Sequence, residues 1–169
     1  MLTLESIGKP ELKTRLEATF TMSNHIEDLQ NRYINLYPNE GCSSEEINKI
    51  ESLLDATLPK SFREIASFFR GGYLGGISHF SFLDDVNPNI IQETLRLRDS
   101  VNLPDEFIVL AEPPESLIVM DTVNTPSVIW FNAVEISNLP QKTFTSPPDE
   151  WETYSDFFEE FLTEEEQGY

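Results

Sequence analysis

The sequence has few of the residues that build metal sites, disulfides or covalent catalysis. Its 169 residues include one cysteine, Cys42, and two histidines, His25 and His79. A single cysteine excludes an internal disulfide, and with two histidines it falls short of the four ligands of a structural zinc site. We therefore expect no metal, no cofactor and a cytoplasmic location, where unpaired thiols are usual.

Basic side chains are also scarce. Eleven Lys and Arg stand against thirty Asp and Glu, a formal net charge of −19, and the acids that follow Lys142 have no basic residue among them. A surface of this sign repels phosphate, so the composition argues against direct binding to nucleic acid or to an anionic membrane. It favours a basic protein partner, although surplus carboxylates also serve plain solubility.

Long apolar runs are missing as well. No run approaches the ~18 residues that a membrane-spanning helix requires, and the first ten residues do not resemble a secretory signal. Hydrophobic residues nevertheless make up 39% of the chain and include twelve Phe, which is enough for a packed interior. The length suits a single domain.

The spacing of apolar residues predicts helices in the first half of the chain. One or two helices are expected within residues 11–37. Ser43 and Glu46 have the spacing of a capping box, which predicts that another helix begins there. Pro59 suits an early position of the next helix, which the glycines after it would end.

The second half of the chain alternates turns with short apolar segments. Residues 73–83 indicate a turn that enters a strand, and Asn87 and Pro88 predict the cap and first residue of a short helix. Ser155 is expected to cap a last, Phe-rich helix. Strands are predicted at 107–111, 117–120 and 128–131. This order predicts an α+β fold, a single domain with a mainly antiparallel sheet packed by helices.

Enzymatic sites find little support in the sequence. Carboxylate pairs can be drawn from thirty acids almost at will, so they carry no weight without geometry. The four glycines between residues 71 and 76 follow a helix and lack the Lys-Ser or Lys-Thr step of a phosphate loop. Asp84, Asp85 and Asn87 lack the spacing and the bidentate Glu of a calcium loop. We predict a protein that is not an enzyme.

The ordered motifs resemble those of one known family. They begin with Glu45, Glu46, Ile47, Ile50 and Glu51, continue with Leu58, Pro59, Phe62, Arg63 and Glu64, and reach the paired glycines Gly71 and Gly72. Apolar and aromatic segments follow at 103–110, 117–121, 128–130 and 151–161. The set resembles the SUKH superfamily, the Smi/Knr-like domain. We expect an N-terminal helical extension at 1–42, the SUKH domain at 43–163 and an acidic tail at 164–169.

The resemblance implies a bacterial immunity protein, an antitoxin that binds and neutralises a cognate secreted toxin. The toxins of such relatives are often nucleases, and an acidic protein can cover the cationic surface with which a nuclease holds phosphates. Other relatives regulate cell-wall assembly in fungi, so a non-enzymatic regulatory scaffold is the alternative. The toxin, the oligomeric state and the role of the extension stay open.

Candidate partner-binding residues are clustered acids at expected loops, with one aromatic residue between the glycine pairs. They are Tyr73, Asp84, Asp85, Glu112, Glu115, Asp149, Glu150 and Glu152. Each acid can also be explained without a partner, as a solvated surface carboxylate. Tyr73 can likewise be explained as a partly buried core residue. Trp130 and the Phe residues of the last helix are expected in the core. The glutamates at 164–166 are expected to form a frayed, solvated helix end.

Overall fold

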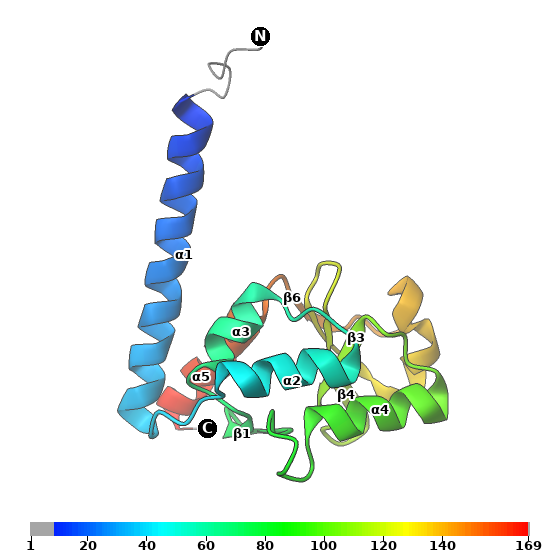
Figure 1. Cartoon of the computed structure of the whole chain (residues 1–169). Coiled ribbons are helices and arrows are strands. Elements are labelled where there is room, and N and C mark those ends of the chain that lie inside the picture. The colour runs from blue at the N-terminus through cyan, green and yellow to red at the C-terminus, as the bar shows by residue number, and fades with distance from the viewer. Residues whose placement is uncertain (1–8, 169) are drawn as a thin grey trace.

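The computed structural model describes residues 9–168 and has an α+β architecture, which confirms the predicted fold class (Figure 1). The elements are α1 (Lys9–Leu36), α2 (Ser44–Leu54), α3 (Lys60–Ala66), β1 (Gly72–Leu74), β2 (Ile77–His79), α4 (Ile90–Val101), β3 (Phe107–Ala111), β4 (Ser116–Asp121), β5 (Val128–Asn132), the 3-10 helix η1 (Ala133–Gln141), β6 (Asp149–Trp151) and α5 (Tyr154–Gln167). Among residues 9–168, no helix combines the length and apolar character needed to cross a membrane.

The main sheet is antiparallel, with the strand order β3-β4-β5-β6, and β1 and β2 form a separate hairpin. Neighbouring elements close the β3 edge. The Val109 N–H donates to Thr94 Oγ1 of α4 at 2.9 Å, and the Phe80 N–H donates to the Leu110 carbonyl at 2.9 Å. At the opposite edge, no described strand pairs with the outer side of β6. The sheet therefore has one covered edge and one open edge.

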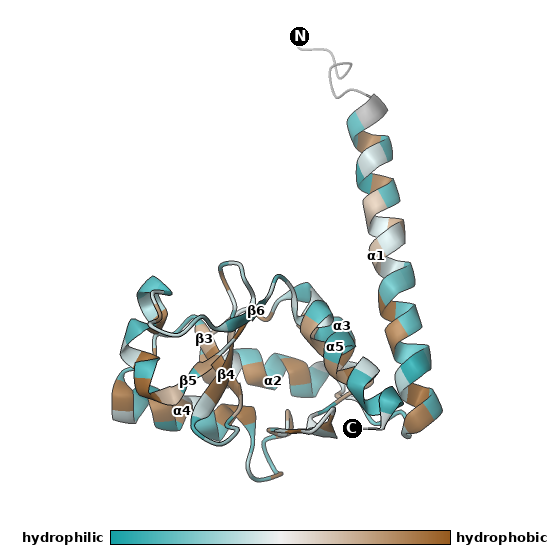
Figure 2. Cartoon of the chain, turned by 180° about the vertical axis from the view of Figure 1, so that it is seen from behind, coloured by the Kyte–Doolittle hydropathy of each residue, from teal (hydrophilic) through white to brown (hydrophobic). Residues whose placement is uncertain are grey.

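Both faces of the sheet are buried, because alternate residues of a strand point to opposite sides. One face packs against α2, α3 and α5 through Ile108, Leu110, Ile118, Met120 and Val128. The other face packs against Leu97 of α4 and Leu139 of η1 through Phe107, Val109, Leu117, Val119, Ile129 and Phe131. In Figure 2 the strands of the sheet are accordingly brown along much of their length.

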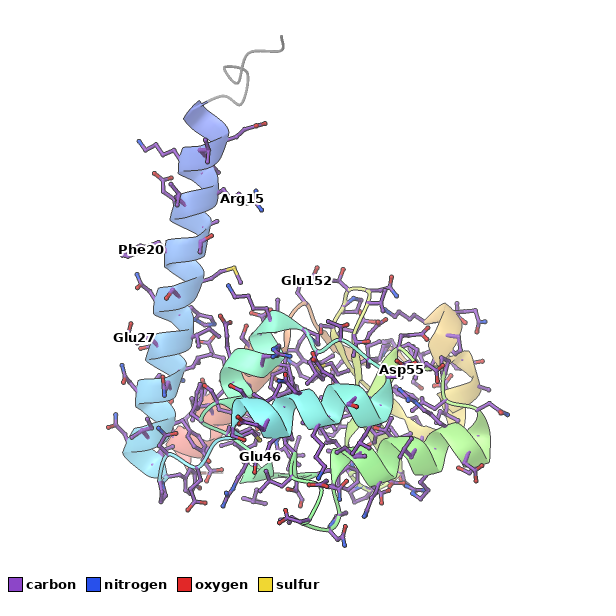
Figure 3. The ribbon with its side chains drawn as sticks, viewed as in Figure 1. Arg15, Phe20, Glu27, Glu46, Asp55 and Glu152 are labelled. Carbon is purple, nitrogen blue, oxygen red and sulfur yellow. The ribbon has the colours of Figure 1, made fainter. Side chains whose placement is uncertain are left out.

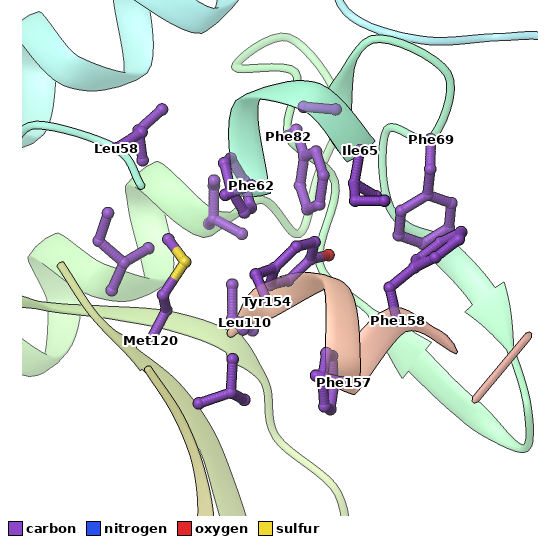
Figure 4. Packing of buried hydrophobic residues seen from close by; sticks show 14 of the residues in the cluster. Leu58, Phe62, Ile65, Phe69, Phe82, Leu110, Met120, Tyr154, Phe157 and Phe158 are labelled. Carbon is purple, nitrogen blue, oxygen red and sulfur yellow. The ribbon is translucent and has the colours of Figure 1, made fainter. Parts of the chain in front are cut away.

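Aromatic side chains fill the core beneath α5, as the sequence predicts. Phe157 and Phe158 of this helix are fully buried. The Phe62 ring of α3 lies with its centroid 4.8 Å from that of Tyr154 and also 4.8 Å from that of Phe82. Figure 4 shows these rings converging between α3 and α5. Their burial in one cluster fixes α5 against the first half of the chain.

The start of α4 differs from the prediction. The N-cap is Asn89, whose side-chain oxygen accepts from the Gln92 N–H at 2.8 Å, and Asn87 and Pro88 lie in the preceding loop. The amide group of Asn89 also donates to the Val86 carbonyl at 3.0 Å. Asn89 is the better cap because its one buried side chain pairs both with a carbonyl of the loop and with a free N–H group of the helix.

Two further boundaries are corrected. Thr153 caps α5, not Ser155, because Thr153 and Asp156 form a capping box in which each side chain accepts from the other residue's backbone N–H. The predicted strand that runs to Phe82 ends at His79. The next residue, Phe80, leaves the hairpin and donates its N–H to the Leu110 carbonyl at the edge of β3.

Helix α1 is one helix of 28 residues, half of which projects from the domain. Its C-terminal half is anchored in the core: Leu29 is fully buried, and the Tyr33 ring lies 5.7 Å from Phe69 and 6.0 Å from Phe158 between centroids. Figure 1 shows the N-terminal half rising clear of every other element.

The acid-rich end of α5 is not frayed, contrary to expectation. Glu165 accepts a hydrogen bond from the Gly75 N–H at 2.7 Å and another from the Tyr37 hydroxyl. Glu166 accepts two from Arg32 of α1. These donors offset the unfavourable position of carboxylates near a helix C-terminus, so the terminal glutamates connect α5 to α1 and to the β1–β2 turn.

Candidate partner-binding surface

The basic side chains of the domain are all neutralised internally. Residues 26–169 contain eight Lys and Arg, and each of them lies in an ion pair with Asp or Glu. They are Arg32, Lys49, Lys60, Arg63, Arg70, Arg96, Arg98 and Lys142. Since carboxylates outnumber these cations more than threefold, the domain presents a field of one sign.

Two of the predicted site acids are engaged in such pairs. Asp84 lies against the Lys49 ammonium, whose hydrogen bond holds the pKa of the carboxyl below its usual value. Glu112 accepts from Arg96 at 2.8 Å. Asp85, beside Asp84 in the β2–α4 loop, is exposed. The paired carboxylates are therefore weaker candidates for contact with a partner than Asp85.

Tyr73 lies in the β1–β2 hairpin and Glu115 lies at the β3–β4 turn. Tyr73, in β1, has 63% of its surface exposed, which excludes the core interpretation. Glu115 sits in the β3–β4 turn with φ +59°, and its carbonyl accepts from the Ala133 N–H at 3.0 Å. Its exposed side chain thus projects from a turn that is tied to the start of η1.

The remaining predicted acids lie along β6, a strand that the sequence did not predict. Asp149 and Glu150 are part of β6, and Glu152 follows it. The Ser127 N–H donates to the Glu152 carbonyl at 3.2 Å. The Asp121 N–H donates to the Ser127 carbonyl, so alternation turns the backbone groups of Ile129 towards β4 and those of Val128 and Trp130 towards β6. Asp149 and Trp151 therefore bond to β5, and the backbone groups of Glu150 face the open edge. The three acidic side chains are exposed and make no ion pair within residues 9–168.

Two tryptophans border this edge, and both lie close to Phe161. Trp151 lies 5.9 Å from the Phe161 centroid, and its indole N–H donates to Glu160 Oε2 at 2.7 Å. Trp130, which was expected in the core, is half-buried; its ring lies 6.2 Å from Phe161 and its indole N–H donates to Ser116 Oγ at 2.8 Å. Each indole is held in position and keeps part of its surface open to a partner.

We call this region the β6 surface. It consists of Trp130, Asp149, Glu150, Trp151, Glu152 and Glu160. Figure 3 shows Glu152 at the upper rim of the domain in that view. Asp149 shares a sheet face with Trp130 and Trp151, whereas Glu150 and Glu152 alternate to the other face, so the surface wraps around the open edge. It combines acids that have no cationic neighbour with two immobilised aromatic rings. Such a combination suits contact with a basic protein, because charge speeds the encounter and buried rings prolong the complex.

A buried carboxylate supports the β4–β5 turn beside Glu152. Asp121 is 1% exposed, and its carboxylate accepts from the Val123 and Asn124 N–H groups at 2.9 Å each and lies 2.9 Å from Lys142 Nζ. Burial alone would raise the pKa of Asp121, but these N–H groups and the ammonium lower it on balance. Asp121 borders a depression of about 210 Å³ that Glu152 also lines. Its oxygens are occupied, so its role is structural.

The predicted residues do not form one continuous site. Glu152 lies at the upper rim in Figure 3, whereas the β2–α4 loop with Asp84 and Asp85 hangs from the lower rim in the same view of Figure 1. The structure brings together only the three acids of the β6 surface. Within the described part of the chain, no group of three His, Cys, Asp or Glu side chains is arranged to hold a metal ion.

Residues 41–164 match the model of the SMI1 / KNR4 family (SUKH-1). The chain belongs to the SMI1/KNR4 family. The match extends from just before α2 into α5 and confirms the resemblance seen in the sequence. No curated protein matches the chain significantly. The SMI1/KNR4 family includes immunity proteins and is generally non-enzymatic.

Sequence reasoning missed Glu160 and the strand character of β6. Glu160 looked like one of many α5 acids, and only the fold places it against the indole of Trp151. The sequence does contain one local signal. Thr153 and Asp156 have the spacing of a capping box, which places the start of α5 at Thr153 and shows that the residues up to Glu152 lie outside the helix.

Proposed function

We propose that this SMI1/KNR4 family member is a cytoplasmic immunity protein that binds and neutralises a cognate secreted toxin. The toxin would be a basic nuclease domain, whose phosphate-binding surface the β6 surface covers. One observation carries the proposal: Asp149, Glu150 and Glu152 stand exposed and uncompensated on an open sheet edge, beside two tryptophans held in place.

Neutralisation by this surface would require only binding and no catalysed reaction. Carboxylates that occupy the phosphate-binding site of the toxin would compete with its substrate, and their charge would raise the association rate. Trp130 and Trp151 would supply the apolar contact that slows dissociation. The outward backbone groups of β6 could add main-chain hydrogen bonds to an extended segment of the toxin.

The direct test is co-expression with the toxin, followed by affinity measurement. In one variant Asp149→Asn, Glu150→Gln and Glu152→Gln are combined. A matched control combines Glu27→Gln, Asp55→Asn and Asp99→Asn, exposed acids elsewhere. We expect the first variant to weaken toxin binding by about tenfold or more and the control by less than about threefold. Equal losses would mean that only net charge matters, and the β6 surface would be abandoned as the site.

The plainer interpretation of the β6 acids is that they keep an open edge from pairing with other sheets. It makes a different prediction. If it is correct, the triple amide variant self-associates through β6 while its toxin binding is unchanged. If no toxin co-purifies with the wild-type protein or is neutralised by it, the regulatory scaffold becomes the better hypothesis.

A further inference from the structure

The projecting half of α1 carries an apolar stripe that no other element within residues 9–168 covers. Leu12, Leu16 and Phe20 are 52%, 67% and 70% exposed. Residues four apart lie on one side of a helix, so these three form a continuous strip. In Figure 2 brown bands recur along this part of α1, well away from the domain.

The stripe faces away from the rest of the molecule. Ile26, Leu29 and Tyr33, which meet the core, lie on a different side of α1, about 100° around the axis from the stripe at 3.6 residues per turn. Figure 3 shows Phe20 pointing outward, on the side opposite the domain, whereas Arg15 points to the domain side. The protein's own domain therefore cannot cover the stripe.

The charge of this segment differs from that of the domain. Residues 9–25 contain three basic and two acidic side chains, whereas residues 26–169 contain 27 acids and eight bases. A basic toxin is attracted to the domain and gains nothing electrostatically from α1. Two copies of this acidic chain repel each other everywhere except along this near-neutral helix.

We propose that the stripe binds a second copy of the chain, through antiparallel pairing of the two α1 helices. With Leu16 opposite Leu16 of the second copy, Leu12 of each chain meets Phe20 of the other. The overlap covers residues 9–23, roughly 22 Å at 1.5 Å per residue. The two acidic domains then lie at opposite ends of the pair. Parallel pairing would bring them side by side and is disfavoured by their repulsion.

Charged residues beside the stripe fit the antiparallel arrangement. Lys13 and Glu17 are one turn apart on the same flank of α1. In antiparallel helices equivalent flanks face each other, so Lys13 of each copy lies near Glu17 of the other. In a parallel pair this flank would face the side that carries Arg15. In this register Glu17 of one copy lies two residues from the level of both Lys13 and Glu17 of the other, so the flank is compatible with antiparallel pairing and charge reversal there provides a test.

The first test is sedimentation of the full chain, without toxin, over about a hundredfold range of concentration. We expect a monomer–dimer equilibrium. Leu16→Glu or Phe20→Glu should weaken dimerisation by about tenfold or more, since each places a charge within the apolar contact, Leu16 at its centre and Phe20 against Leu12 of the other copy. The matched control is Val134→Glu, on η1 and 84% exposed, which should leave the equilibrium unchanged. Circular dichroism checks that α1 stays helical in each variant.

Charge reversal tests the orientation. Lys13→Glu and Glu17→Lys should each weaken self-association, because like charges then oppose each other in both halves of the pair. Mixing the two variants should produce a heterodimer in which both contacts are complementary. The proposal is wrong if the wild-type chain stays monomeric throughout, if Val134→Glu acts as strongly as Leu16→Glu, or if the two reversed variants do not prefer each other.

This inference does not depend on the proposed function. A dimer that dissociates with Phe20→Glu supports it whether or not a toxin binds the β6 surface. If instead the chain is monomeric and Phe20→Glu weakens toxin capture, α1 belongs to the toxin interface and self-pairing is excluded.

Discussion

Arg32 of α1 donates two hydrogen bonds to the carboxylate of Glu166 in α5, at 3.0 Å and 2.8 Å, across 134 residues of sequence. The same guanidinium donates to Thr163 Oγ1 at 2.9 Å and to Glu159 at 3.3 Å. A bidentate pair of this kind fixes orientation as well as distance. The helix that precedes the family domain is thus tied to the last helix of that domain.

Loss of this pair should loosen α1 without unfolding the domain. The hydrogen bond from Arg32 lowers the pKa of Glu166, so its stabilising effect is present above the unfolded pKa and is lost as the pH falls. Because the pair borders solvent, we expect Glu166→Gln to reduce the free energy of unfolding by roughly 1 kcal/mol at neutral pH. Hydrogen exchange in α1 should rise. Glu164→Gln, two residues earlier, serves as the control and should change neither quantity.

Two adjacent glycines provide a sharper test of how α5 meets the β1–β2 turn. A Cβ on Gly75 would lie 2.5 Å from the Phe161 carbonyl oxygen, whereas a Cβ on Gly76 would have no atom within 4 Å. Both have positive φ, +58° and +82°. We expect Gly76→Ala to cost about 1 kcal/mol from backbone strain alone and Gly75→Ala about 3 kcal/mol or more. Urea unfolding measures both; equal losses would contradict the contact with α5.

The buried Asp121 should tolerate replacement poorly. Asp121→Asn keeps the size of the side chain but removes the charge that Lys142 and two backbone N–H groups face. We expect a loss of about 3 kcal/mol, mostly because Lys142 is left without its counter-charge. In a double-mutant cycle with Lys142→Met, the two losses should be strongly non-additive. Additive losses would mean that the two side chains act independently.

A buried histidine makes stability depend on pH in a defined window. Burial lowers the pKa of His79 to about 4, and its Nε2 has no hydrogen-bond partner. The unfolded chain takes up a proton near pH 6.5 while the folded chain does not, so the free energy of unfolding falls as the pH drops from 6.5 towards 4. The loss is up to about 3 kcal/mol. His79→Phe should remove this part of the pH dependence in urea unfolding; an unchanged slope would contradict it.

The parts of the fold that sequence predicted are those with local signals. The capping box of Ser43 and Glu46 is present in α2, and strands β3, β4 and β5 fall where β-branched residues cluster. Strand β6 was missed because three residues rich in acid become a strand only by pairing with β5. The role of Glu166 was missed for the same reason, since its partner is remote in sequence.

The candidate site divides in the same way. The sequence could identify clustered acids, but it could not show which of them form ion pairs with Lys or Arg. Asp84 and Glu112 find cations on other elements, whereas Asp149 and Glu150 do not. The exposure of Phe20 was equally unpredictable, because apolar spacing predicts a helix and does not reveal whether anything covers its apolar side.

Salt should separate the two contributions to toxin binding. Because exposed carboxylates act at long range, the association rate should fall by about tenfold as the salt concentration rises from about 0.02 to 0.2 M. The dissociation rate should change by less than about threefold over this range. Trp151→Phe keeps the ring packed on Phe161 but loses the bond to Glu160, and should raise the dissociation rate without changing the salt dependence of association. A dissociation rate that follows salt as steeply as association would mean that charge alone holds the complex, and the tryptophans would have no part in it.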